Sequence, residues 1–486
     1  MRVLFLQPPL GSWVTWGDHK PINVSHAQMS ACVRKWVAEA EIKVLDCRAL
    51  NLDAEKMVSA IQEIDPDLIY MGDAYQMTET VAIVPHYQNA ARRIKKTRPD
   101  TPICVGGFYV AANYQAVADE TPEFDFVLAG EPEMTFTELC KELVKDAPDF
   151  PSVKGLMYRQ NGDIKLNEYR PLMKNLDDLP MPAYDLFPMD KYLGYGSLPH
   201  YQEIFTSRGC PFGCSFCIDW VTMDPRGNRD WQKYRIKSAK QVVDELELLE
   251  NEYGVEYVHI FDLNFNPKRS RIEAFLKEMQ QRKLKMKYCF LGNAHSFIRD
   301  SDLLEDLHKT GFVTGVFGLE VADEDELKKM HKGITLDEVR EVTAQFRKYG
   351  ITSVITWMIG FPDDDEKIIK HRLNVLDQID PDVMALQMLL PVPGMPMYEE
   401  CVPYIEEHDL TKWDFHQPVV RTKHLTREQL GSLAAWANKE FYTKKDRVQR
   451  VLQSEVLSPY SKAIFKSYIA SMADYSSKAS KQDVAV

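Results

Sequence analysis

The sequence predicts an α/β protein in which a doubly wound, Rossmann-like domain precedes a partial (β/α)6 barrel of the TIM type and a helical C-terminal region. Three observations support this prediction. Strand-like apolar runs alternate with helical stretches in two successive series, a segment rich in Pro and Asp separates the series, and the end of the chain has a helical pattern. Such alternation is typical of parallel sheets covered by helices.

Residues 1–145 contain the first series. Its strand-like runs are 2–9, 42–49, 67–73, 102–109 and 124–130, with helical segments such as 25–40 between them. Doubly wound sheets bind ligands outside the carboxyl ends of their strands. The loops at these ends contain Gly106, Gly107, Gly130 and Glu131, and we therefore expect them to lie near a ligand.

Residues 146–200 form a predicted linker. Pro and Asp are frequent in it, as in NLDDLPMPAYDLFPMD at 175–190. Within it, residues 155–169 resemble a β-hairpin that turns at Asn161–Gly162. We expect the linker to wrap between the two domains.

The second series occupies residues 201–400. Its strand-like runs are 203–209, 257–264, 287–293, 314–320, 352–360 and 382–390. A barrel of this type has its active site at the C-terminal ends of the strands. Residues 401–486 are predicted to be mainly helical and to cover the barrel mouth. Their aromatic residues are candidates to line a pocket for a small molecule, lipid or tetrapyrrole, although each is expected first to pack in the core: Trp413, Phe415, Trp436, Phe441 and Tyr442.

Composition excludes several classes of protein. The net charge of −13 argues against a nucleic-acid partner held by bulk electrostatics. No apolar stretch reaches the roughly 18 residues of a membrane span, and no signal peptide is visible at the N-terminus. We therefore expect a cytoplasmic protein, in which the nine cysteines do not form a disulfide framework.

Three cysteines stand apart from the scattered six. Cys210, Cys214 and Cys217 lie in RGCPFGCSFC, directly after the first strand of the second series. A structural zinc site needs four ligands, and no fourth Cys or His lies nearby in the sequence. A [4Fe–4S] cluster held by three thiolates leaves one iron open to a substrate or cofactor. This spacing favours a catalytic cluster over zinc or incidental cysteines.

The CxxxCxxC run after the first strand of a β/α barrel resembles the radical S-adenosylmethionine (SAM) superfamily. The resemblance implies that the open iron binds SAM and that one electron cleaves SAM to a 5′-deoxyadenosyl radical. It also implies an external electron donor, such as a flavodoxin or a ferredoxin.

The same resemblance implies a set of SAM contacts at the ends of later strands. Glu320 in FGLE resembles the acidic residue that binds the SAM ribose, and Gly360 in ITWMIGFP resembles the adenine-binding segment. Asp262 and Asn264 in FDLNFN lie where the family contacts the methionine part of SAM. Arg235 is a candidate to clamp a carboxylate of SAM or of the substrate.

The N-terminal domain resembles that of the cobalamin-binding subfamily, also called class B. LDDLPMPAYDLF, VGGFYVAA and AGEPEMTFTEL carry this resemblance, with Pro132, Phe108 and Tyr109 as departures. Cobalamin would then lie near Gly106 and Gly107 and face Tyr75 and Gln76. No Asp-x-His-x-x-Gly motif is present, so we expect no His ligand to cobalt. Alternatively, the domain has lost its cofactor and is a scaffold.

The resemblance implies methylation of an unactivated carbon, with methylcobalamin as the methyl donor and a second SAM restoring it. One alternative is oxidative ring closure or hydroxylation, because RDWQKYRIKSAKQVVDEL also resembles the anaerobic magnesium-protoporphyrin monomethyl ester cyclase at Trp231, Tyr234 and Arg235. A third hypothesis is a non-catalytic iron–sulfur protein.

Overall fold

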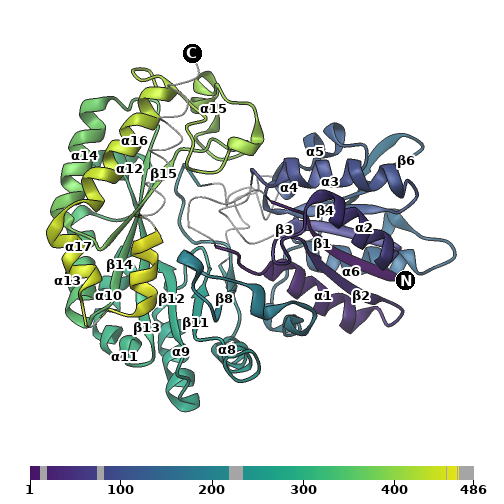
Figure 1. The fold of residues 1–486 in the computed structure, drawn as a ribbon, viewed down its shortest axis with the longest axis horizontal. Helices are drawn as coiled ribbons and strands as arrows, with labels where there is room; N and C mark the ends of the chain where they lie inside the picture. The colour runs from purple at the N-terminus through teal and green to yellow at the C-terminus, as the bar shows by residue number, and fades with distance from the viewer. Residues whose placement is uncertain (11–18, 74–80, 218–233, 456, 468, 470–486) are drawn as a thin grey trace.

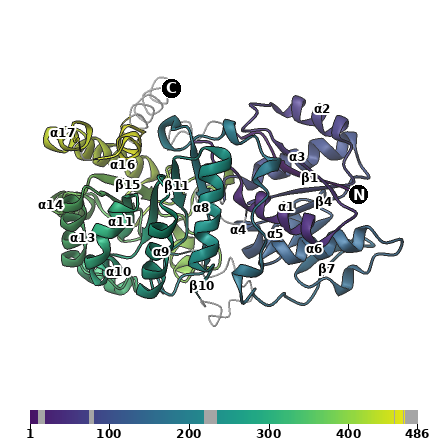
Figure 2. The same ribbon diagram turned by 90° about the horizontal axis from the view of Figure 1, so that it is seen from below.

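The computed structural model describes residues 1–10, 19–73, 81–217, 234–455, 457–467 and 469. Two β/α units lie side by side, with the N-terminal unit at the right of Figure 1 and the barrel at the left. The view in Figure 2 shows the same separation. Tyr75, Gln76 and Trp231, which the sequence analysis singled out, lie outside the described residues.

The N-terminal sheet has the strand order β2-β1-β3-β4-β5-β6-β7. The first five strands are parallel, as predicted, and their order is that of flavodoxin-like sheets, with the switch point between β1 and β3. The strands are β1 (Arg2–Gln7), β2 (Glu41–Asp46), β3 (Leu68–Asp73), β4 (Ile103–Gly107), β5 (Phe126–Leu128), β6 (Leu156–Gln160) and β7 (Asp163–Leu166).

Strands β6 and β7 are the hairpin at Asn161–Gly162, and β6 pairs antiparallel with β5. The sheet therefore continues past residue 145, into the segment predicted as a linker. Helices α1 and α6 pack on one face of the sheet, and α2, α3 and α5 pack on the other. The helices are α1 (Val24–Trp36), α2 (Ala54–Ile64), α3 (Val84–Thr97), α4 (Phe108–Ala112), α5 (Tyr114–Glu120) and α6 (Pro132–Leu143).

The second sheet has six parallel strands in the order β15-β14-β13-β12-β11-β8. Each strand pairs with the next one along the chain, which is the topology of the predicted partial barrel. The strands are β8 (Tyr201–Ile204), β11 (Tyr257–Ile260), β12 (Lys287–Gly292), β13 (Phe312–Glu320), β14 (Thr352–Ile359) and β15 (Val383–Met388). A separate antiparallel pair, β9 (Ser207–Arg208) and β10 (Arg235–Ile236), follows β8.

Three of the barrel helices begin at polar N-caps whose side chains bond to the first turn. Ser238, Thr335 and Asp365 each accept a hydrogen bond from a backbone N–H of the first turn, which satisfies a donor that the helix leaves open. The helices are α8 (Ala239–Tyr253), α9 (Arg269–Arg282), α10 (Ala294–Arg299), α11 (Leu304–Lys309), α12 (Glu324–Lys329), α13 (Leu336–Tyr349) and α14 (Glu366–Ile379).

The C-terminal region reaches both ends of the barrel. Near the mouth, the N–H of Met388 at the end of β15 donates to the carbonyl of Phe415 at 2.6 Å. At the opposite end, Tyr460 stacks on Tyr201, the first residue of β8. The first part of this region therefore contacts the mouth end of the barrel, and its covering the mouth stays a prediction. The helices here are α15 (Tyr398–Cys401), α16 (Arg427–Tyr442) and α17 (Lys445–Leu452).

Candidate functional site

The cysteine loop, residues 209–217, follows β9 at the carboxyl end of the barrel strands. Cys210, Cys214 and Cys217 are partly exposed, whereas the other six cysteines are buried, as predicted. The Cys217 N–H donates to the Cys214 carbonyl at 3.2 Å, so the loop turns tightly. Ser215 anchors it, because its N–H donates to Met330 and its carbonyl accepts from Met397, both at 3.1 Å.

The chemistry of this loop fits an iron–sulfur cluster. Three partly exposed thiols lie on a short loop, and thiolate is the ligand that iron–sulfur clusters use. Within the described ranges, no group of three or more His, Cys, Asp and Glu side chains forms a closed metal site. The thiols are thus neighbours along one loop rather than a converged ligand set.

Glu320 ends β13 in a strained conformation. Its φ of 66° is left-handed, which non-glycine residues adopt rarely. Its carboxylate accepts hydrogen bonds from the Thr356 hydroxyl of β14 at 3.1 Å to each oxygen. Gly318, two residues earlier, leaves the necessary space, because a Cβ there would lie 1.9 Å from Glu320 Oε1. Strain of this kind concentrates at functional sites, so Glu320 remains a good candidate ligand-binding residue.

Lys332 is a residue that sequence reasoning missed. Its ammonium lies 2.8 Å from Glu320 Oε1 and 5.3 Å from the centre of the Phe216 ring. Burial lowers the pKa of Lys332, but Glu320, Cys214 and Cys217 outweigh it and raise that pKa above its usual value. A buried cation thus stands between Glu320 and the cysteine loop. In the sequence, Lys332 is marked only by its place in an irregular segment that follows the predicted site residue Glu320.

Asp262 was predicted to contact SAM, and in the structure its carboxylate binds the protein. Oδ1 accepts from the N–H groups of Thr206 at 2.6 Å and Ser207 at 2.9 Å. Oδ2 accepts from the Thr206 hydroxyl and from Arg271, at 2.6 and 3.0 Å. Asp262 therefore holds the segment that leads into the cysteine loop, and direct contact with SAM stays a prediction.

Asn264 and Gly360 lie at strand ends, as expected from the sequence. The Asn264 side chain is buried and accepts from the Asn266 N–H at 3.3 Å. Gly360 has a φ of 103°, which favours glycine, and its N–H donates to Asp364 at 2.8 Å. The adenine contact of Gly360 and the methionine contact of Asn264 stay predictions.

Arg235 and Glu131 were predicted to contact cofactors, but they contact each other. Arg235 Nη1 lies 2.8 Å from Glu131 Oε1, and Arg208 Nη1 lies 3.0 Å from the same atom. Arg208 also pairs with Glu133. All four residues are buried, and their charges balance. The glutamates belong to the N-terminal domain, so this cluster joins the two domains beside the cysteine loop.

The carboxyl edge of the N-terminal sheet is built from backbone at its centre. Gly72 of β3 pairs with Gly106 of β4, and Gly107 follows with a φ of 119°. Asn23, the N-cap of α1, donates to the Gly72 carbonyl at 3.0 Å across the switch point. Gly130 turns the chain between β5 and α6 with a φ of 90°. In the described part of this edge, backbone at Gly72, Gly106 and Gly107 is where a flat ring system such as a corrin would approach.

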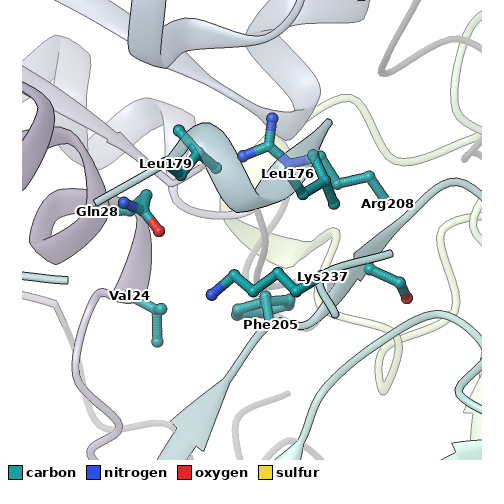
Figure 3. Close-up of a pocket in the computed structure, with 8 residues that line it drawn as sticks. Val24, Gln28, Leu176, Leu179, Phe205, Arg208 and Lys237 are labelled. Atoms are coloured by element: carbon teal, nitrogen blue, oxygen red, sulfur yellow. The ribbon is translucent and has the colours of Figure 1, made fainter. Parts of the chain in front are cut away.

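A small pocket lies between the domains (Figure 3). Val24 and Gln28 of α1 line one side, and Phe205 and Arg208 of the barrel line another. The pocket therefore lies at the boundary between the two domains, next to the buried charges of Arg208, Arg235, Glu131 and Glu133.

Comparison with known families identifies the barrel. Residues 204–373 match the family model described as the radical SAM superfamily. The matched region contains the cysteine loop, Glu320 and Lys332. The barrel is therefore a radical SAM domain, and the chain is an enzyme. None of the helices in the described part of the chain has the length and hydropathy of a membrane span.

Similarity to individual proteins extends over both domains. The chain is 27% identical over 451 residues to an uncharacterized methyltransferase of Pyrococcus horikoshii, a match that covers 91% of this chain and 93% of the other. It is 26% identical over 455 residues to the anaerobic magnesium-protoporphyrin IX monomethyl ester cyclase of Cereibacter sphaeroides, covering 92% and 71%. The solved radical SAM methyltransferase TsrM of Kitasatospora setae, with cobalamin and a [4Fe–4S] cluster bound, has a TM-score of 0.65 at 17% identity, covering 83% and 78%. The last comparison shows that the fold is shared.

Proposed function

We propose that the chain is a cobalamin-dependent radical SAM enzyme that methylates an unactivated carbon of a small-molecule substrate. One observation carries this proposal: Arg208, at the base of the cysteine loop, pairs with Glu131, at the carboxyl edge of the N-terminal sheet. The two predicted cofactor regions are therefore adjacent. The names of the Pyrococcus relative and of TsrM support methyl transfer as the reaction.

The residues of the chain have separate tasks in this proposal. Cys210, Cys214 and Cys217 hold the cluster, and Glu320 accepts hydrogen bonds from the hydroxyls of the SAM ribose. Lys332 offers a buried positive charge to an anionic group beside Glu320. When bound, the cluster with SAM supplies a 5′-deoxyadenosyl radical and cobalamin supplies the methyl group.

The substrate is proposed to have a large apolar part. Phe108 of the N-terminal domain and Trp413 of the C-terminal region belong to one buried apolar cluster, against which Phe415 packs. This cluster lies where the edges of both domains meet, so it would border a substrate held between them. By contrast, Phe441 and Tyr442 are core residues. A cytoplasmic location and a flavodoxin or ferredoxin as electron donor complete the proposal.

Oxidative ring closure is the second candidate, because the Cereibacter cyclase is similar over nearly the same length of chain. Of the three positions that suggested it, Trp231 lies outside the described residues, and the other two contact the protein. The Tyr234 hydroxyl donates to the Phe265 carbonyl at 3.2 Å, and Arg235 binds Glu131. The third hypothesis, a non-catalytic iron–sulfur protein, is not supported by the relatives, which are named as enzymes.

The test uses anaerobically purified and reconstituted protein with hydroxocobalamin, desalted before its absorption spectrum is recorded. Retained corrin beside a [4Fe–4S] spectrum, with both S-adenosylhomocysteine and 5′-deoxyadenosine formed from SAM, supports methylation. 5′-Deoxyadenosine alone favours ring closure or another oxidation. The variant with Cys210, Cys214 and Cys217 all changed to Ala should bind no cluster iron and cleave no SAM; cleavage by this variant would refute the cluster assignment.

A further inference from the structure

The buried charge cluster of Arg208, Glu131, Glu133 and Arg235 closes the base of the cysteine loop. Arg208 lies two residues before Cys210, and Arg235 pairs with Arg208 in the antiparallel β9–β10 ladder. One atom, Glu131 Oε1, contacts Arg208 at 3.0 Å and Arg235 at 2.8 Å. Arg208 precedes the cysteines and Arg235 follows them in the chain. The same carboxylate of the other domain, that of Glu131, therefore contacts both residues.

We infer that Glu131 and Glu133 are positioning residues, which set the orientation of the three cysteines relative to the N-terminal sheet. This inference rests on the proposed function, because it assumes that the cysteines hold a cluster. Neither glutamate needs to touch a cofactor for this role. Their effect passes through Arg208 and Arg235 to the backbone of the cysteine loop.

The position of both carboxylates is determined by the N-terminal domain. Glu131 is the N-cap residue of α6, and Glu133 lies in its first turn, where the helix dipole favours negative charge. A second contact holds Glu131, because its Oε2 accepts from the Met173 N–H at 2.9 Å, while the Met173 carbonyl accepts from Arg235 at 2.8 Å. The location of both glutamates therefore follows from α6 and does not depend on the barrel.

The barrel holds the same segment from its own side. Asp262 accepts hydrogen bonds from the backbone N–H groups of Thr206 and Ser207. Arg271 donates to the Thr206 hydroxyl at 2.5 Å. Residues 206–208 are therefore held by contacts from both domains. Because all the charges are buried, removal of one carboxylate leaves an arginine without compensation, which is costly. A change in this charge cluster must therefore move either the start of the cysteine loop or the contact between the two domains.

The experiment compares Glu133→Gln and Glu131→Gln with Glu138→Gln in cluster-reconstituted protein. Glu138 is a matched control, because it also lies on α6 and pairs with an arginine, but its partner Arg170 belongs to the same domain. We measure hydrogen–deuterium exchange of peptides covering residues 204–217 and the electron paramagnetic resonance spectrum of the reduced cluster with and without SAM.

We expect exchange at 204–217 to rise at least tenfold in the Glu131 and Glu133 variants, and the SAM-dependent change of the spectrum to be reduced or lost. Glu138→Gln should match the wild type in both. Wild-type exchange and spectra in Glu131→Gln and Glu133→Gln, or equal changes in Glu138→Gln, would overturn the inference. If Glu133→Gln does not fold, Arg235→Lys is measured in its place; it keeps the charge but not the planar guanidinium whose Nη1 reaches both Glu131 and the Met173 carbonyl.

Failure of the proposed function gives a different result. A protein that retains no corrin but still shows the expected exchange and spectral changes contradicts cobalamin-dependent methylation and leaves the positioning role standing. A protein that retains corrin and forms both SAM products, with no effect of Glu131→Gln or Glu133→Gln, contradicts only the positioning role.

Discussion

Lys332 and Glu320 form a buried ion pair of 2.8 Å at the carboxyl end of β13. Thr356 of the neighbouring strand bonds to the same carboxylate, and Glu320 itself has a left-handed backbone. The carboxylate is thus held in one orientation by two elements and by its own backbone. Such preorganisation is useful at a binding site, because the protein has met the cost of ordering before the ligand arrives.

Gly318→Ala should disrupt this arrangement. The new methyl group would lie 1.9 Å from Glu320 Oε1 and 2.5 Å from Lys332 Nζ, so the ion pair must move. We expect the Kd for SAM, measured by equilibrium dialysis, to rise about tenfold, which corresponds to ~1.4 kcal/mol. Gly431→Ala on α16 is the control, because its nearest contact is at 3.7 Å, and it should leave SAM binding unchanged. An unaltered Kd in Gly318→Ala would show that the pair does not contribute to the site.

Lys332→Met should weaken SAM binding while leaving the cluster in place. The change removes a buried cation beside Glu320 and the cysteine loop, and we expect the Kd for SAM to rise at least tenfold, or ~1.4 kcal/mol. Lys332→Arg should restore part of the affinity, since it keeps the charge. The control is Lys329→Met on α12, whose side chain is 57% exposed. Equal affinities of Lys332→Met and Lys329→Met for SAM would contradict the role of Lys332.

Asp262→Asn should destabilise the barrel. Arg271 is 4% exposed at its side chain and would lose its buried carboxylate partner. Breaking a buried pair from one side costs about 3–5 kcal/mol, so the free energy of unfolding in urea should fall by that order. Asp302→Asn removes an exposed partner of Arg269 and should cost at most about 1 kcal/mol. Similar losses in the two variants would refute a structural role specific to Asp262.

His259 should make the stability of the protein fall in acid. Burial lowers the pKa of His259 to about 4, against the opposing effect of Glu203. Below the unfolded-state pKa near 6.5, His259 is protonated in the unfolded chain but stays neutral in the folded chain. The free energy of unfolding therefore decreases as the pH falls from about 7 to 4. The loss is about 3 kcal/mol.

The measurement is urea unfolding at several pH values in this range. His259→Gln removes this imidazole and should make the dependence shallower by the His259 share, while the buried His26, whose pKa burial lowers to about 3, keeps its own contribution. His295→Gln, at a side chain that is 64% exposed, should leave the dependence unchanged. The same acid slope in His259→Gln as in the wild type would assign the effect to other groups.

The order of strands and helices could be predicted from the sequence because each element leaves a local pattern. The parallel strands β1 to β5 and the six strands of the barrel follow from apolar runs separated by helical periods. The spacing of Cys210, Cys214 and Cys217 and the place of Glu320 at a strand end are local features too. They depend only on residues that are near each other in the chain.

The tertiary structure alone decided which charges meet. Arg208 and Glu133 are 75 positions apart, and nothing near either residue in the sequence announces the other. The same is true of Lys332, which reaches Glu320 from an irregular segment, and of Asp262, whose carboxylate binds the base of the cysteine loop. A local pattern determines secondary structure because it acts between neighbours in the chain, but the partner of a buried charge depends on how distant elements and whole domains pack.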